Sequence, residues 1–511
     1  MHDYISRYPY LVLALSGGIC GVLFSLGFAP VSFSPAAFAG AVLLTALISH
    51  LGSARRAAWT SWFFGLGWFC PGLAWTTESM AVHGRLPWPL AWLGLLLLGA
   101  VCALFVAVAA YAARRLVKTP GAFPFAFAAL WCLSEWVRAE VFPFFGWLAP
   151  GYAFMETRFL GWAPLAGIDG VTLASLLCTA ATAALLLQPG WRRFFLTVFI
   201  LCFFAGWGEF GLSHNWSRPG PTLHVRMAQP ALPVADAWTR TTPAERINAL
   251  LPLAVGSWPD DSRPRLFLTP EGIVNQPVSR LDQASVEALV TLQNRAEAPL
   301  LFNGFRSDAR GFFNTAFLLE NARIVWSLDK RLLVPFGEFV PAGARWFVDL
   351  LGIPLADLKP GTLGQPLLEL GDVSAGLLIC YENLSGSVVR SMFSGSESPE
   401  ILVVTANLGW FAAEVIPQHL DMTRMRALEA SRPAVSVSND GLSALVNEKG
   451  RVVETMRASG TDSRTFTVTG TTGAATPYVR FGSIGALLAA LMILLAAFLC
   501  ARSGLKTARR A

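Results

Sequence analysis

Residues 482–501 read GSIGALLAALMILLAAFLCA, an apolar run long enough to cross a bilayer as one helix, which takes about 20 residues. Seven similar runs precede residue 215, at approximately 9–28, 34–52, 57–76, 88–112, 121–137, 164–187 and 194–212. The 511-residue chain is 54% hydrophobic and only 14% charged, whereas a typical soluble protein has about 25% charged residues. These observations exclude an ordinary cytosolic protein and predict eight transmembrane helices.

The basic residues at the ends of these runs predict the orientation of the helices. Twelve Lys and Arg residues lie at the ends that share one side of the membrane, and five lie at the other ends. The larger group is Arg7, Arg55, Arg56, Arg114, Arg115, Lys118, Arg192, Arg193, Arg502, Lys506, Arg509 and Arg510, and the smaller is Arg85, Arg138, Arg158, Arg218 and Arg480. Because basic residues concentrate on the cytoplasmic side, we expect both termini in the cytoplasm and the segment after the seventh run outside it.

The distribution of charge also separates three regions of the chain. Residues 221–475 carry a net charge of −4, whereas the rest of the chain carries +10, which together make the overall +6. The basic excess therefore reflects membrane topology and gives no reason to expect a nucleic-acid partner. We expect a seven-helix transmembrane domain at 1–215, a soluble domain at 221–475, and a last helix with a cytoplasmic tail at 480–511.

The soluble segment is typical of an α/β domain. Short apolar runs rich in β-formers, such as RLFLTPE at 265–271 and VSAGLLICYE at 373–382, alternate with helical patterns. This alternation predicts a sheet covered by helices, in a domain large enough to have its own core. Seven of the eight cysteines fall in the apolar runs, so Cys380 is alone in this domain and no disulfide can form within it.

Three residues at the ends of apolar strands supply the elements of acyl transfer. Cys380 ends one strand, Glu271 directly follows another, and Lys330 precedes an apolar stretch. A free thiol has a pKa of about 8.5 and needs a base or a nearby cation to react at neutral pH. A carboxylate, a fixed cation and a thiol suffice for acyl transfer through a thioester, with His419 left open as an alternative base. We find neither a Gly-x-Ser-x-Gly elbow nor a convincing zinc motif, so we expect no metal and no cofactor.

The motifs around these residues carry a resemblance to a known family. Pro270-Glu271, Asp329-Lys330 followed by Val-Pro-Phe-Gly-Glu338, and Cys380-Tyr-Glu382 are similar to the Glu-Lys-Cys triad motifs of the nitrilase superfamily. With its apolar runs, nearly the whole chain resembles the apolipoprotein N-acyltransferases, a membrane family of that superfamily. One departure is Ala412, which follows Trp410-Phe411 where the family more often has Gly. The resemblance implies an extracytoplasmic domain folded as an α-β-β-α sandwich.

The resemblance also implies roles for individual residues. Glu271, Lys330 and Cys380 would be catalytic, and supporting or substrate-binding roles would fall to Glu338, Tyr381, Glu382, Asn314, Trp238, Trp410 and Arg138. Glu338 and Glu382 would orient Lys330 or contact the incoming amine, although Glu338 could instead form a structural salt bridge with Arg331 or Arg345. Arg138 would bind a phosphate head group or pair with Glu135.

The function implied is the last step of lipoprotein maturation. Such enzymes pass the sn-1 acyl chain of a phospholipid, typically phosphatidylethanolamine, to the α-amino group of the S-diacylglyceryl cysteine that begins an apolipoprotein. The resemblance implies a monomer in the bacterial inner membrane with its catalytic domain in the periplasm. Two other functions remain open: a membrane-anchored amidase that uses water as acceptor, and a transporter with a regulatory soluble domain. The scarcity of ionisable residues within the apolar runs argues against the transporter.

Overall fold

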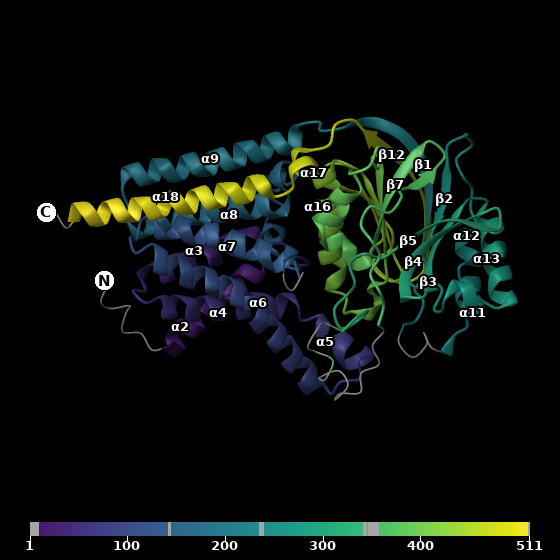
Figure 1. The fold of residues 1–511 in the computed structure, drawn as a ribbon, viewed down its shortest axis with the longest axis horizontal. Helices are drawn as coiled ribbons and strands as arrows, with labels where there is room; N and C mark the ends of the chain where they lie inside the picture. Colours follow the sequence, from purple (N-terminus) through teal and green to yellow (C-terminus); the bar gives the residue numbers. More distant parts are fainter. Residues whose placement is uncertain (1–9, 142–144, 235–239, 341–344, 346–356, 509–511) are drawn as a thin grey trace. The chain divides into compact units, whose positions relative to one another are not determined.

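The computed structural model describes residues 10–141, 145–234, 240–340, 345 and 357–508. These residues form two compact units. The helical unit comprises Met1–Thr77, Pro87–His214 and Arg480–Ala511, and the two-sheet unit comprises Glu78–Leu86 and Asn215–Val479. Figure 1 shows both, with the chain coloured along its sequence.

Eight helices of 16 to 29 residues, counted over the described residues of the helical unit, coincide with the eight predicted runs. They are α2 (Tyr10–Ser25), α3 (Ser34–His50), α4 (Ala54–Gly72), α6 (Trp88–Leu116), α7 (Phe123–Glu140), α8 (Ala163–Leu187), α9 (Trp191–Ser213) and α18 (Ile484–Ala508). By length and composition four of them can cross a membrane: α6, α9, α18, and α8 with the 3₁₀ turn η3 (Arg158–Trp162) before it. Helices α2 and α3 are apolar but shorter. The structure therefore shows a multi-pass membrane protein, and the count of eight spans stays a prediction.

Packing in the helical unit is typical of a membrane protein. Helices α2 and α4 approach closely at glycines, because a Cβ added at Gly17 or Gly21 would lie 2.2 or 2.0 Å from the carbonyl oxygen of Thr60 or Phe64. Helices α9 and α18 leave large apolar side chains exposed, among them Phe195 at 63% and Met492 at 65%. Such surfaces are stable in lipid rather than in water.

The two-sheet unit contains two six-stranded sheets. Sheet 1 has the order β12-β1-β2-β3-β4-β5 and sheet 2 the order β11-β10-β9-β8-β7-β6. Sheet 1 consists of β1 (Arg218–Gln229), β2 (Arg265–Leu268), β3 (Leu300–Asp308), β4 (Gly311–Glu320), β5 (Arg323–Asp329) and β12 (Asp462–Thr472). Sheet 2 consists of β6 (Leu368–Leu370), β7 (Val373–Ile379), β8 (Ile401–Ala406), β9 (Ala434–Ser438), β10 (Ala444–Val446) and β11 (Val452–Thr455).

Helices cover the outer face of each sheet. Sheet 1 is covered by α11 (Pro243–Asn248), α12 (Leu251–Ala254) and α13 (Gln283–Ala296). Phe267 of β2 and Leu292 of α13 belong to the hydrophobic core between them. Sheet 2 is covered by α15 (Gly386–Ser391) and α16 (Val415–Ala430), and Val404 of β8 and Ala427 of α16 belong to the hydrophobic core between them. Strand β1 contacts β7 and β9, so the inner faces meet, and Figure 1 shows helices flanking the two sheets. The resulting layers are helix, sheet, sheet and helix, as the resemblance implied.

Candidate active site

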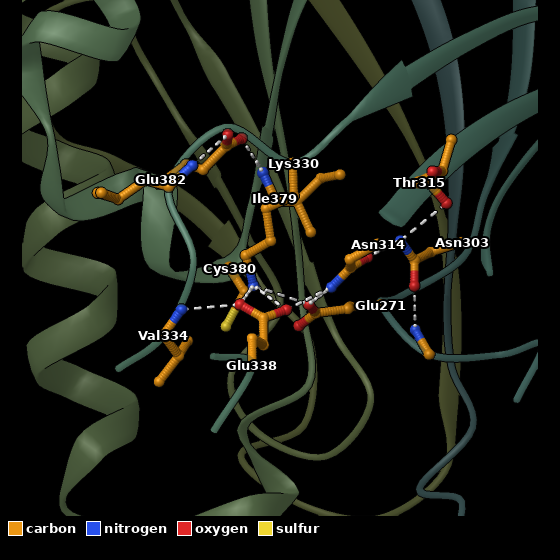
Figure 2. A network of polar contacts seen from close by, with 12 residues as sticks. Glu271, Asn303, Asn314, Thr315, Lys330, Val334, Glu338, Ile379, Cys380 and Glu382 are labelled. Atoms are coloured by element: carbon orange, nitrogen blue, oxygen red, sulfur yellow. Dashed lines mark hydrogen bonds and ion pairs between the residues drawn. The ribbon is translucent and has the colours of Figure 1, made fainter. Parts of the chain in front are cut away.

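The strand directions bring the ends of several strands together. Strand β2 runs parallel to β3, and β5 is antiparallel to β4, which is itself antiparallel to β3. The carboxyl ends of β2 and β5 therefore lie at one edge of sheet 1, where Glu271 follows β2 and Lys330 follows β5. Cys380 follows β7 in the facing sheet, and Figure 2 shows the three side chains pointing toward one another.

Lys330 lies between two carboxylates. Its Nζ is 3.1 Å from Oε1 of Glu271 and 2.9 Å from Oε2 of Glu338, and its side chain is 1% exposed. Burial alone would lower the pKa of Lys330, but the two carboxylates outweigh it and raise that pKa above its ordinary value. The site therefore contains a permanent cation. Of the roles considered for Glu338, the structure supports the contact with Lys330, since Arg331 pairs with Glu382 instead.

An amide chain orients the two carboxylates. Asn314 on β4 donates from Nδ2 to Oε1 of Glu271 at 2.8 Å and to Oε1 of Glu338 at 2.7 Å. Its own oxygen accepts from Nδ2 of Asn303 at 2.7 Å, and Oδ1 of Asn303 accepts from the Gly272 backbone N–H at 2.7 Å. Asn303 was not among the site residues expected from the sequence, where its signal is an amide in the otherwise apolar run PLLFNGF.

Cys380 occupies a strained turn. Its φ of +50° lies in the left-handed region, which non-glycine residues rarely adopt and which occurs preferentially at functional sites. The turn joins β7 to the 3₁₀ helix η5 (Cys380–Leu384). Burial, and next to it the charge of Glu271, raise the pKa of the Cys380 thiol, and Lys330 offsets this only in part. The charge of Glu271 acts on the thiol, so a neutral thiol lies beside a carboxylate that can take its proton (Figure 2).

Glu382 holds this turn in place through Arg331. Its carboxylate accepts from Nε and Nη2 of Arg331 at 2.9 and 2.8 Å, from the Arg331 backbone N–H at 2.5 Å, and from the Ile379 N–H at 2.9 Å. Glu382 is fully buried, so the structure gives it a structural contact with Arg331 where we expected one with Lys330 or with substrate. Burial is the largest influence on the pKa of Glu382 and raises it, but Arg331 and the hydrogen bonds together lower it.

This ion pair predicts the effect of Glu382→Gln on stability. Removing one charge of a buried pair leaves the other unpaired, so we expect the free energy of unfolding at pH 7 to fall by about 3–5 kcal/mol. Because the folded-state pKa of Glu382 is lowered, its contribution is present above the unfolded-state pKa and is lost as pH falls through the folded-state value. Thermal unfolding in detergent at pH 7 and in acid would measure both effects.

An exposed ion pair provides the control for that experiment. Asp357→Asn removes a carboxylate that is 62% exposed and pairs with Lys359, and we expect no measurable change in stability. Equal unfolding midpoints for wild type and Glu382→Gln at pH 7 would contradict the structural role of Glu382.

The remaining expected residues differ in where the structure places them. Tyr381 lies buried in η5 beside Cys380. Trp410 lies in η6 (Leu408–Trp410), which follows β8. Strand β8 neighbours β7, where Thr405 pairs with Ile379. The Trp410 ring packs edge-on against His83, with 5.1 Å between the ring centroids. Trp238 lies outside the described residues.

Arg138 and His419 have partners that the sequence left open. Arg138 is buried on α7, bonds through Nε to Oε2 of Glu135 at 3.0 Å, and donates from Nη1 to the carbonyl oxygens of Phe145 and Trp147. This geometry supports the ion pair and not the head-group site. His419 Nε2 lies 3.3 Å from the carbonyl oxygen of Cys380. Among the residues that the structure describes, no group of three or more His, Cys, Asp and Glu side chains could hold a metal.

Two family models match separate parts of the chain. A family model described as "Carbon-nitrogen hydrolase" matches residues 252–472, and one described as "Apolipoprotein N-acyltransferase N-terminal domain" matches residues 20–181. The "Apolipoprotein N-acyltransferase" of Ralstonia nicotianae is 33% identical over 493 residues, covering 94% of this chain and 92% of that protein. The protein of the same name from Nitrosomonas europaea is 32% identical over 512 residues, covering 98% and 99%. The chain belongs to the apolipoprotein N-acyltransferase family.

Solved structures resemble only part of the chain. A nitrilase-superfamily protein from Saccharomyces cerevisiae is 17% identical, with a TM-score of 0.37, and the match covers 49% of this chain and 91% of that one. An amidase from Nesterenkonia is also 17% identical, with a TM-score of 0.35 and coverage of 52% and 95%.

Proposed function

We propose that this chain is an apolipoprotein N-acyltransferase that carries the acyl group on Cys380. The acyl donor is the sn-1 chain of a phospholipid such as phosphatidylethanolamine, and the acceptor is the α-amino group of an N-terminal S-diacylglyceryl cysteine. The observation that carries the proposal is the buried Lys330, held between Glu271 and Glu338 beside a neutral thiol. A base, an oxyanion-stabilising cation and a nucleophile are thereby available within one water-poor site.

The first half-reaction transfers the acyl group to sulfur. Glu271 takes the thiol proton, and the thiolate attacks the ester carbonyl to give a tetrahedral oxyanion. Lys330 stabilises the oxyanion together with a backbone N–H near Tyr381, and one such donor contributes about 3–4 kcal/mol to transition-state stabilisation. Collapse breaks the ester C–O bond, Glu271 returns the proton to the leaving oxygen, and lysophospholipid departs.

The second half-reaction uses the same groups in the same order. The acceptor amine attacks the thioester, and Glu271 accepts the proton that the nitrogen loses. Lys330 again stabilises the oxyanion, and collapse expels the Cys380 thiolate, which recovers its proton from Glu271. Glu338 and Asn314 hold the side chains of Lys330 and Glu271 in position during both half-reactions. Trp238 and Trp410 supply apolar contacts for the lipid substrates.

The transmembrane helices suit these water-insoluble substrates. We propose that all eight helices span the bacterial inner membrane, with domain limits at 1–215, 221–475 and 480–511 and the protein active as a monomer. The surplus of basic residues at one set of helix ends supports cytoplasmic termini and a periplasmic catalytic domain.

Orientation has a direct test. A periplasm-dependent alkaline phosphatase reporter fused after residue 475 should be active, and the same reporter fused after Ala511 should be inactive. The reverse pattern would contradict the proposed topology.

Trapping the intermediate tests the function itself. Purified protein incubated with phospholipid and no acceptor should gain one acyl mass on the peptide containing Cys380, and hydroxylamine should remove it. Addition of a diacylglyceryl lipopeptide should discharge the acyl group to the peptide's amine. Mass spectrometry that finds only free thiol while transfer proceeds at full rate would exclude the covalent route.

A further inference from the structure

His419 is bound to the backbone of the nucleophile. It lies on α16 with 3% of its surface exposed, and its Nε2 is 3.3 Å from the Cys380 carbonyl oxygen. Its own carbonyl oxygen accepts from Nδ2 of Asn383 at 3.1 Å, and the same Nδ2 donates to Oγ1 of Thr423 at 2.8 Å. Asn383 belongs to η5. Two hydrogen bonds therefore connect α16 to the turn that contains Cys380, one through the His419 ring and one through its carbonyl oxygen.

This contact determines which ring nitrogen carries the proton. A carbonyl oxygen only accepts hydrogen bonds, so Nε2 of His419 must be the donor. Burial lowers the pKa of His419 to about 4, which leaves the ring neutral at pH 7 with its single proton on Nε2. The nitrogen that faces Cys380 therefore cannot accept the thiol proton, and the alternative base considered from the sequence is wrong for this geometry.

The contact also fixes a peptide plane. The Cys380 carbonyl and the Tyr381 N–H belong to one planar trans peptide unit and point in opposite directions. A donor that holds the oxygen therefore sets the direction of the N–H, and hydrogen bonds in series polarise one another. The left-handed φ of Cys380 makes such support necessary, because this conformation persists only where the surroundings hold it.

We propose that His419 is a positioning residue, which holds the Cys380–Tyr381 peptide so that its N–H faces the oxyanion formed in both half-reactions. The inference rests on the proposed function, since it requires a tetrahedral intermediate at Cys380. It assigns His419 to transition-state stabilisation and neither to proton transfer nor to substrate binding.

The test compares two reactions of the same thiol. Acylation by phospholipid passes through an oxyanion, whereas alkylation by iodoacetamide is a direct displacement at carbon and forms none. His419→Leu should slow both acylation and transfer to a lipopeptide by about 10-fold to 100-fold, with KM unchanged and the alkylation rate within about twofold of wild type. His419→Gln retains an N–H donor and should recover part of the acylation rate.

Controls make each outcome informative. His224→Leu removes the other buried histidine of the two-sheet unit, which bonds Thr467 and Asp261, and should leave acylation unchanged. If His419→Leu does not accumulate, His419→Phe provides ring volume without a donor. Parallel losses of acylation and alkylation, or normal acylation without the donor, would overturn the positioning role. Absence of a thioester in the wild type would instead refute the proposed function.

Discussion

Cys380→Ala should abolish acyl transfer, with a loss of at least about 10⁴-fold, while the protein still accumulates in the membrane. The expected size follows from the proposed mechanism, because without sulfur no covalent intermediate forms and the two lipids would have to react directly. Stability should change little, since the thiol is neutral and small at the end of a strand. The measurement is transfer of a labelled acyl chain from phospholipid to a diacylglyceryl lipopeptide.

A second cysteine provides the matched control for this variant. Cys202 on α9 is exposed in the helical unit, so Cys202→Ala should retain wild-type transfer. Full acylation of the lipopeptide by Cys380→Ala would disprove the nucleophile assignment. Release of ammonia from small amides without any lipid requirement would instead favour the amidase that the sequence left open.

The apolar runs, and the three candidate residues that the fold brings together, could be identified from the sequence because their signals are local. A span of about 20 apolar residues specifies a membrane helix by itself, and the predicted runs coincide with helices from α2 to α18. Glu271 and Cys380 were identifiable because each stands at the end of an apolar strand, and Lys330 because it precedes an apolar stretch. The parallel direction of β2 and β5 then places Glu271 and Lys330 at one sheet edge.

Other features depend on contacts between distant segments and could not be predicted in this way. Glu382 pairs with Arg331, which is 51 positions away, and not with Lys330, which directly precedes Arg331 in the sequence. Asn303 reaches the site because β3 pairs with β4, which no local pattern indicates. In each case the sequence supplied the charged or polar group, and the tertiary fold selected its partner.

Glu271→Gln should slow both half-reactions by about 10²-fold to 10⁴-fold, which is the usual contribution of a general base. The amide retains the size of the carboxylate and an oxygen that can accept from Lys330 and Asn314, so the site should keep its shape. What is lost is the carboxylate whose charge acts most strongly on the Cys380 thiol. Burial keeps the pKa of that thiol high, so very little thiolate exists at pH 7 without the base.

The pH dependence of the variant distinguishes loss of a base from loss of structure. With Glu271 removed, acylation depends on the thiolate that forms unaided, and its population increases about tenfold per pH unit below the raised thiol pKa. The acylation rate of Glu271→Gln should therefore rise steeply from pH 7 to pH 9, with a shallower rise in the wild type. Glu320→Gln makes the same chemical change at the exposed far end of β4 and should follow the wild-type profile. A slow variant whose rate does not respond to pH would indicate a distorted site, and one that slows only the second half-reaction would assign the thiol proton to a different base.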